Sequence, residues 1–129
     1  MSNYMKRVLI TMAFSLLGLF SCRGQNNLTV NEFEAMFAAD TTVQLLDVRT
    51  PEEFAEGHIG EAMNIDWKAD GFAEKAQAQL ATERPVMVYC RSGRRSAEAA
   101  AVLEKLGFKT YNLKGGILAW IDAGKQVTL

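Results

Sequence analysis

The sequence predicts an α/β protein with an open parallel sheet and helices on both faces of the sheet. Short apolar segments bounded by Gly, Pro or charged residues alternate with helical segments, a pattern typical of βαβ units. Asp47, Arg49 and Cys90 lie at the ends of two of these apolar segments. Open α/β sheets bind ligands beyond the carboxyl ends of their strands, so these residues are candidates for a functional site. A length of 129 residues favours one folded domain.

The first 21 residues differ in composition from the rest of the chain. Lys6 and Arg7 precede a mostly apolar run from Val8 to Phe20, which is typical of a secretory signal peptide and short for a membrane span. Leu19-Phe20-Ser21-Cys22 resembles a bacterial lipoprotein signal, in which the Cys becomes the lipidated N-terminus. We expect residues 1–21 to be cleaved and the protein to be exported, as a membrane-anchored lipoprotein or in the periplasm. Ordinary cleavage nearby and an uncleaved anchor remain alternatives.

The charge and cysteine content narrow the possible partners and cofactors. Removing Lys6 and Arg7 from the 14 basic residues leaves 12, against 15 acidic ones. This balance lacks the basic surplus of nucleic-acid binding proteins, so we expect no nucleic-acid partner. If Cys22 is acylated, Cys90 is the only thiol and no intramolecular disulfide can form. One Cys and the single His cannot form a four-ligand zinc site, and we expect neither a metal nor another cofactor.

The folded domain is expected to begin after a short tether. Residues 22–27 are assigned to this tether, and residues 28–129 to the domain. Asn31 is a candidate N-cap, and Glu34 three residues later completes a capping-box pattern. Apolar residues at helical spacing extend the predicted helix through Ala39.

The next unit is a strand followed by a short helix. The apolar segment Val43 to Val48 predicts a strand. Thr50 is expected to cap a helix over Pro51 to Glu56, because Pro is favoured at the first helical position and Glu53 completes a capping box. Gly57 is expected to end this helix.

The remaining elements continue the alternation of strands and helices. Residues 62–65 and the segment Val86 to Tyr89, which Pro85 introduces, predict strands, and residues 71–80 predict a helix. A longer helix is expected from Ser96 to Leu106, with Gly107 just beyond its end. Lys109 to Leu113 predicts the last strand, and Ile117 to Asp122 the last helix.

Cys90 opens the segment Cys90-Arg91-Ser92-Gly93-Arg94-Arg95-Ser96, between a predicted strand and a predicted helix. Free N–H groups and the dipole at a helix N-terminus attract anions. Arg91, Arg94 and Arg95 add three full positive charges. These effects favour the thiolate of Cys90 over the thiol, and the thiolate is the nucleophile. A buried structural cysteine would explain Cys90 alone, but it would not explain the three arginines beside it.

The segment from Cys90 to Ser96 resembles the active-site loop of the rhodanese family, Cys-x-x-Gly-x-Arg-Ser. Two flanking stretches are also similar to rhodanese: Leu46-Asp47-Val48-Arg49-Thr50-Pro51-Glu52-Glu53-Phe54-Ala55-Glu56-Gly57-His58-Ile59 and Leu113-Lys114-Gly115-Gly116-Ile117-Leu118-Ala119-Trp120. The three motifs stand in family order, and from the first to the last they span most of the chain after residue 28. One departure is Gly60-Glu61, where the family commonly has Pro-Gly.

The resemblance implies a rhodanese-like fold and a sulfurtransferase that works by two displacements. The Cys90 thiolate would attack the sulfane sulfur of a small anionic donor such as thiosulfate, and sulfite would leave. The resulting persulfide would pass its sulfur to a thiol or to cyanide. His58 would occupy a structural position and not act as a general base.

The resemblance also implies a set of site residues around the catalytic Cys90. The candidate substrate-binding residues are Arg91, Ser92, Gly93, Arg94, Arg95, Ser96, Asp47 and Arg49. Arg91 and Arg94 are the first candidates for contact with the donor anion. A salt bridge for Arg95, and an ion pair between Asp47 and Arg49, are structural alternatives. Ser96 is expected to cap the following helix, with its hydroxyl near the sulfur.

Two other functions are compatible with parts of the pattern. A cysteine phosphatase would need Cys-x5-Arg, but position 96 of this chain is Ser. The shorter loop of this chain would make a cradle too small for a tetrahedral phosphate. A lipid-tethered persulfide carrier, or a binding module whose partner does the chemistry, is the second alternative. A persulfide on Cys90 without turnover of thiosulfate would favour the carrier.

Overall fold

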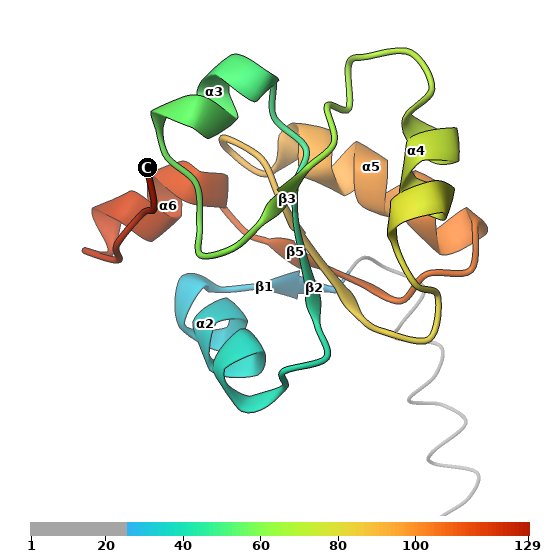
Figure 1. Ribbon diagram of the computed structural model, residues 1–129. Coiled ribbons are helices and arrows are strands. Elements are labelled where there is room, and N and C mark those ends of the chain that lie inside the picture. The colour runs from blue at the N-terminus through green and yellow to red at the C-terminus, as the bar shows by residue number, and fades with distance from the viewer. Residues whose placement is uncertain (1–25) are drawn as a thin grey trace, which may run out of the picture.

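The computed structural model describes residues 26–129, and in this part of the chain five strands form one parallel sheet (Figure 1). The order across the sheet is β1-β5-β4-β2-β3. The strands are β1 (Asn27–Leu28), β2 (Gln44–Asp47), β3 (Met63–Asn64), β4 (Val86–Tyr89) and β5 (Thr110–Leu113). The predicted open parallel sheet is therefore confirmed. The predicted signal peptide and the lipidation site at Cys22 lie outside the described residues.

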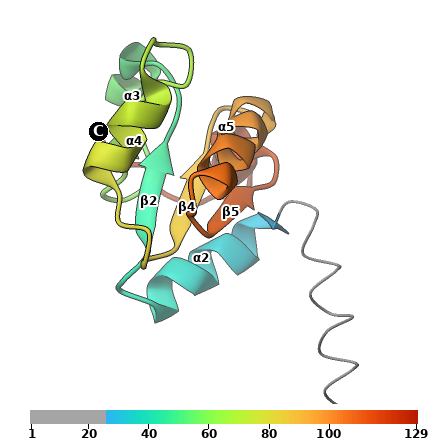
Figure 2. The same ribbon diagram turned by 90° about the vertical axis from the view of Figure 1, so that its right-hand side faces the viewer.

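Helices pack on both faces of this sheet (Figures 1 and 2), as predicted. They are α2 (Val30–Ala39), α3 (Pro51–Glu56), α4 (Phe72–Gln79), α5 (Arg94–Lys105) and α6 (Gly116–Asp122). Side chains of α4 and α5 join the core cluster on one face, and those of α2 and α6 join the cluster on the other. None of the helices in residues 26–129 is long and apolar enough to cross a membrane.

The central strand β4 shows why the chain forms two core layers. Successive side chains of a strand point to opposite faces. Val86 and Val88 accordingly pack with α4 and α5, whereas Met87 and Tyr89 pack with α2 and α6. Every residue of β4 is buried, which is typical of a strand in the middle of a parallel sheet. Cys90 continues this alternation and belongs to the α4 and α5 layer.

The first helix begins earlier than the sequence predicts. Thr29, and not Asn31, is the N-cap of α2: the Thr29 hydroxyl accepts the N–H of Glu32 at 3.2 Å. The Glu32 carboxylate in turn accepts the N–H of Thr29 at 2.9 Å, so the capping box is displaced by two residues. The reason is that Thr29 already has an extended backbone and Asn31 lies within the first helical turn.

The predicted start of α3 is confirmed. Thr50 accepts the N–H of Glu53, Glu53 accepts the N–H of Thr50, Pro51 occupies the first turn and Gly57 follows the last one. The Glu53 carboxylate that closes this capping box also forms an ion pair with Arg95 of α5.

Several boundaries differ from the predicted ones. Asn27, assigned to the tether, is the first residue of β1 and pairs with Asn112, and the Asn26 side chain donates to the carbonyl of Thr110 at 3.2 Å. The strand predicted over residues 62–65 is reduced to Met63–Asn64, because only these two residues pair with β2. The helix predicted from Ser96 begins at Arg94.

Candidate active site

Cys90 lies directly beyond the carboxyl end of β4. Tyr89, the last residue of that strand, pairs with Asp47 at the end of β2, so the ends of two adjacent parallel strands are side by side. The seven-residue segment from Cys90 to Ser96, called the Cys90 loop below, leads from β4 into the first turn of α5. This is the edge of an α/β sheet where ligands bind.

The Cys90 loop directs hydrogen-bond donors at the sulfur. The Gly93 N–H donates to Cys90 Sγ at 3.0 Å, and the Ser96 hydroxyl donates to it at 3.3 Å. Both donors favour negative charge on the sulfur. Cys90 is 1% exposed and forms no disulfide among the described residues. The sulfur therefore lies at the floor of the loop, with donors for a thiolate already in place.

Gly93 provides the turn that creates this arrangement. Its φ is +102°, a conformation that L side chains rarely adopt, and it is the N-cap of α5. A Cβ at this position would also lie 3.3 Å from the backbone nitrogen of Gly115. The expectation that Ser96 caps the helix is wrong, because Gly93 holds that position. Ser96 is in the first turn and fully buried, and its hydroxyl contacts the sulfur.

The start of α6 supports the Cys90 loop from below. The N–H of Ile117 donates to the Cys90 carbonyl at 2.9 Å, and the N–H of Leu118 donates to the Arg91 carbonyl at 3.1 Å. Gly116 has a φ of +64°, and a Cβ there would overlap the Arg91 carbonyl. The Gly115-Gly116 pair therefore allows the backbone of α6 to approach the loop closely.

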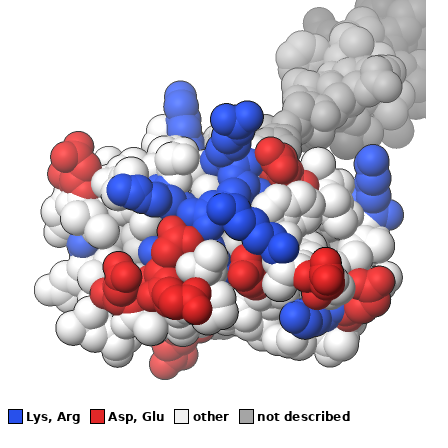
Figure 3. Space-filling model, turned by 90° about the horizontal axis from the view of Figure 1, so that it is seen from above, with Lys and Arg blue, Asp and Glu red and all other residues white. Residues whose placement is uncertain are grey.

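The three arginines of the loop have different environments. Arg95 forms a bidentate ion pair with Glu53 of α3, with N–O distances of 2.8 and 2.9 Å. The side chains of Arg91 and Arg94 are exposed and form no hydrogen bond or ion pair with residues 26–129. On the face shown in Figure 3, which is viewed from above Figure 1, Lys and Arg side chains gather at the centre, beside Asp and Glu side chains. The structural alternative for Arg95 therefore holds in this structure, while Arg91 and Arg94 are available to an anion.

Glu53 connects two elements of the site. It closes the capping box of α3 and also holds Arg95 of α5. The Arg95 guanidinium, together with the Thr50 N–H, holds the pKa of Glu53 at about 2, below its ordinary value of 4.5. Glu53 is thus charged over the whole physiological range, and it neutralises Arg95.

Asp47 and Arg49 form a buried ion pair. Arg49 Nη2 lies 2.7 Å from Asp47 Oδ2, and the two side chains are 7% and 0% exposed. Arg49 also donates to the Gly57 carbonyl at 2.7 Å, and its backbone N–H donates to Asp47 Oδ1. Burial raises the pKa of the neighbouring Tyr89 phenol, and the Asp47 charge adds to this effect. Asp47 and Arg49 therefore form the ion pair expected of the structural alternative, and Arg49 also links the end of β2 to the end of α3.

His58 packs against α3. Its ring stacks on Phe54 with a centroid distance of 4.0 Å, and its Nδ1 forms a hydrogen bond with the Phe54 carbonyl. The His58 backbone exchanges two hydrogen bonds with Thr128, which fixes the C-terminal segment beside α3. These contacts agree with the expected structural role of His58.

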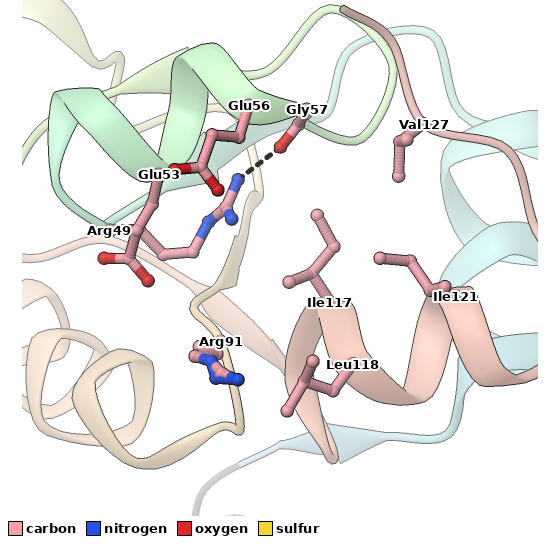
Figure 4. Close-up of a pocket in the computed structure, with 9 residues that line it drawn as sticks. All are labelled: Arg49, Glu53, Glu56, Gly57, Arg91, Ile117, Leu118, Ile121 and Val127. Carbon is pink, nitrogen blue, oxygen red and sulfur yellow. Dashed lines mark hydrogen bonds between the residues drawn. The ribbon is translucent and has the colours of Figure 1, made fainter.

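A pocket of about 280 Å³ adjoins the Cys90 loop (Figure 4). It lies between α3, α6 and the C-terminal segment, and its lining residues are Arg49, Glu53, Glu56, Gly57, Arg91, Ile117, Leu118, Ile121 and Val127. Arg91 is the loop residue that borders it. Within residues 26–129, no group of three or more His, Cys, Asp or Glu side chains is arranged to hold a metal ion.

The geometry defines an α/β protein in which Cys90, the one cysteine of residues 26–129, lies in a short, cationic loop at the carboxyl edge of a parallel sheet. Comparison with known proteins identifies the family. The family model for the rhodanese-like domain matches residues 29–123, and the chain therefore belongs to the rhodanese-like family.

Curated relatives and solved structures agree with this family. The chain is 40% identical over 91 residues to a protein named sulfurtransferase from Allochromatium vinosum, covering 69% of this chain and 82% of that protein. It is 31% identical to a putative mitochondrial thiosulfate sulfurtransferase of Schizosaccharomyces pombe, covering 93% of each. The crystal structure of a rhodanese-like domain protein from Staphylococcus aureus superposes with a TM-score of 0.69 at 30% identity, covering 81% of this chain and all of that one.

Two features of the site have only weak signals in the sequence. Glu53 stands in a motif attributed to a helix cap, and nothing in that motif shows that it also binds Arg95. Asn112 of β5 lies beneath the loop, and its amide donates to the Gly93 carbonyl at 3.4 Å and to the Asn27 side chain at 3.0 Å. Polar residues in a predicted central strand are the signal that could have identified Asn112.

Proposed function

We propose that this protein is a thiosulfate:cyanide-type sulfurtransferase that carries sulfur as a persulfide on Cys90. The observation that supports the proposal most directly is the environment of the sulfur, which accepts hydrogen bonds from the Gly93 N–H and the Ser96 hydroxyl. Membership in the rhodanese-like family, and relatives named as sulfurtransferases, support the same reaction class.

In the first step, the Cys90 thiolate attacks the outer, sulfane sulfur of thiosulfate. A new S–S bond forms to Cys90 Sγ while the S–S bond of thiosulfate breaks, and its electron pair leaves with sulfite. Arg91 and Arg94 stabilise the anionic donor and the departing sulfite, because both are exposed and unpaired among the described residues. The Gly93 N–H, which donates to Cys90 Sγ, would also lie beside the persulfide.

In the second step, a thiolate or cyanide attacks the outer sulfur of the Cys90 persulfide. The S–S bond breaks, its electron pair returns to Cys90 Sγ, and the acceptor leaves as a persulfide or as thiocyanate. No general base is needed, because the Cys90 thiolate in the first step and the acceptor thiolate or cyanide in the second are already ionised. This is consistent with the packing role of His58.

We further propose that residues 1–21 are removed and that Cys22 is lipidated, so that the domain acts outside the cytoplasm on a membrane anchor. The support is the sequence pattern of Lys6 and Arg7, the apolar run and Cys22. Metabolic labelling with a fatty acid, in full-length protein and in Cys22→Ser, tests this proposal, because only the former is expected to incorporate label.

Thiocyanate production from thiosulfate and cyanide tests the enzymatic proposal. Wild-type protein should turn over, and Cys90→Ser should lose at least a thousandfold of kcat/KM, since a hydroxyl is a far weaker nucleophile at neutral pH. Circular dichroism should show an unchanged fold. Retained activity in Cys90→Ser would contradict the mechanism. Persulfide formation on wild-type Cys90 without turnover would favour a carrier that depends on a partner.

A further inference from the structure

The pocket beside the Cys90 loop is larger than the proposed small substrates need. Its volume of about 280 Å³ equals that of about nine water molecules at 30 Å³ each, which far exceeds the size of cyanide or thiosulfate. It is also bounded on three sides, by α3, by α6 and by Val127 of the C-terminal segment (Figure 4). Its size and enclosure fit one small organic molecule.

Two of the four charged side chains that line this pocket are already paired. Arg49 binds Asp47 and the Gly57 carbonyl, and Glu53 binds Arg95. The side chains of Arg91 and Glu56 are exposed and form no hydrogen bond or ion pair with residues 26–129. In Figure 4, Arg91 lies on the side of Leu118, whereas Glu56 lies beside Arg49 on the opposite side. An anionic group is therefore favoured at the end near the Cys90 loop and disfavoured at the Glu56 side.

The wall between these ends is apolar. Ile117, Leu118 and Ile121 point into the pocket from α6 (Figure 4). Leu118 and Ile121 are 45% and 52% exposed, and they are three residues apart, so they share one helix face. An inorganic anion gains nothing from this wall, but an alkyl group would bury part of it.

The apolar wall is connected to the nucleophile. The N–H groups of Ile117 and Leu118 donate to the carbonyls of Cys90 and Arg91, so the start of α6 is held against the Cys90 loop. A molecule that lies along Leu118 and Ile121 would place its end near Arg91, on the loop that carries the Cys90 persulfide.

We propose that this pocket binds the sulfur acceptor, a low-molecular-weight thiol carried on an apolar chain, and that Leu118 and Ile121 determine its selectivity. The inference rests on the proposed function. Arg91 attracts the acceptor thiolate, the chain packs on Leu118 and Ile121, and Glu56 selects against a carboxylate at the distal end. The thiolate forms a bond to the outer sulfur, the bond from that sulfur to Cys90 Sγ breaks, and its electron pair stays on Cys90. The acceptor leaves as an organic persulfide.

A single-turnover experiment with a homologous series of neutral thiols tests the selectivity. Cys90 persulfide is prepared with inorganic polysulfide in residues 23–129, which lack Cys22. The protein is freed of excess reagent and mixed with 2-mercaptoethanol, 4-mercaptobutan-1-ol or 6-mercaptohexan-1-ol. Loss of the extra sulfur is followed by intact mass. For wild-type protein, the second-order rate constant should rise roughly fourfold for each CH₂ that the wall buries. A rate constant that does not depend on chain length would overturn the proposal.

Substitutions on the wall assign the effect to particular residues. Leu118→Ser and Ile121→Ser should each reduce the dependence on chain length, and the double variant should nearly abolish it. Leu129→Ser is the matched control, because Leu129 is 91% exposed and does not line the pocket, and it should behave as wild type. The same chain-length dependence in wall and control variants would contradict the assignment.

Loading with polysulfide separates this inference from the proposed function. If polysulfide forms the persulfide and thiosulfate does not, the donor in the proposed function is wrong, and acceptor selectivity is still measured. If both load Cys90 but all thiols react alike, the proposed function stands and the inference fails.

Discussion

Arginines follow the carboxyl ends of both adjacent strands β2 and β4, but the arginine after β2 is buried and paired, whereas two of those after β4 are exposed and unpaired among residues 26–129. At the end of β2, Asp47 and Arg49 are buried and satisfy each other. At the end of β4, the Cys90 sulfur accepts two hydrogen bonds, while Arg91 and Arg94 remain exposed without partners among residues 26–129. Both ends lie where an α/β sheet binds ligands, but only the second has charge available for one.

This difference shows how to separate structural from functional arginines in the site. Arg49 and Arg95 each bind a carboxylate through two nitrogens. Arg95 links α5 to Glu53 of α3, and Arg49 links the end of β2 to the Gly57 carbonyl at the end of α3. A paired guanidinium offers little net charge to a substrate. The arginines without partners, Arg91 and Arg94, are therefore the ones we assign to the donor anion.

The largest effect is expected from removal of Asp47, which tests the buried ion pair at the end of β2. Asp47→Ala would leave Arg49 buried without its partner, and we expect a loss of about 3–5 kcal/mol in the free energy of unfolding. Urea denaturation measures this loss. The double variant Asp47→Leu/Arg49→Met should recover most of it, because a buried ion pair can be replaced by apolar residues of similar volume. A loss below about 1 kcal/mol in the single variant would mean that the pair is not structural.

The exposed arginines after β4 are tested by replacing both of them with alanine. Arg91→Ala/Arg94→Ala should raise the KM for thiosulfate about tenfold, with a smaller effect on an uncharged persulfide donor. The free energy of unfolding should change by less than about 0.5 kcal/mol, since both side chains are exposed. Lys105→Ala, at the other end of α5, is the matched control for loss of a positive charge. Equal losses on the two donors would instead assign the arginines to the loop fold.

The smallest effect on stability is expected from loss of the ion pair between Glu53 of α3 and Arg95 of α5. Glu53→Gln should reduce the free energy of unfolding at pH 7 by about 1 kcal/mol, because its ion pair with Arg95 is partly exposed. Glu56→Gln, on the same helix and without an ion pair among the described residues, is the control.

The Glu53 contribution should also depend on pH. The folded-state pKa of Glu53, about 2, is below its ordinary value of 4.5, so its stabilisation is complete above about pH 5 and is lost as the pH falls toward 2. Denaturation of wild type and Glu53→Gln across this range should show their difference shrinking with acidity. A constant difference would mean that the ion pair is not its source.

Much of the fold could be predicted because local signals and tertiary structure agree. The capping box at Thr50, the Pro at the start of α3 and the buried strand β4 all act over a few residues. The cap of α2 was misplaced by two residues because Asn31 and Glu34 form the same pattern as Thr29 and Glu32. The choice between them depends on where the chain leaves β1, which is a tertiary feature.

The chemistry of the Cys90 loop is easier to predict from the sequence than the residues of other elements that contact this loop. Cys90 and its arginines are contiguous in the sequence, so their spacing alone indicates an anion-binding loop. Glu53 is 42 residues from Arg95 and Gly93 is 19 residues from Asn112, and these contacts arise only when the sheet brings α3 and β5 beside the loop. The prediction that Ser96 is the helix cap is wrong for a local reason: Gly93 turns the chain with a positive φ, and α5 begins before Ser96 is reached.

The most direct test of the central claim is the intact mass of the domain, residues 23–129, before and after thiosulfate and then after cyanide. The account predicts a gain of one sulfur atom, about 32 Da, mapped to Cys90 and lost with release of thiocyanate. A reduced, titratable Cys90 with no gain in mass would contradict thiosulfate as the donor.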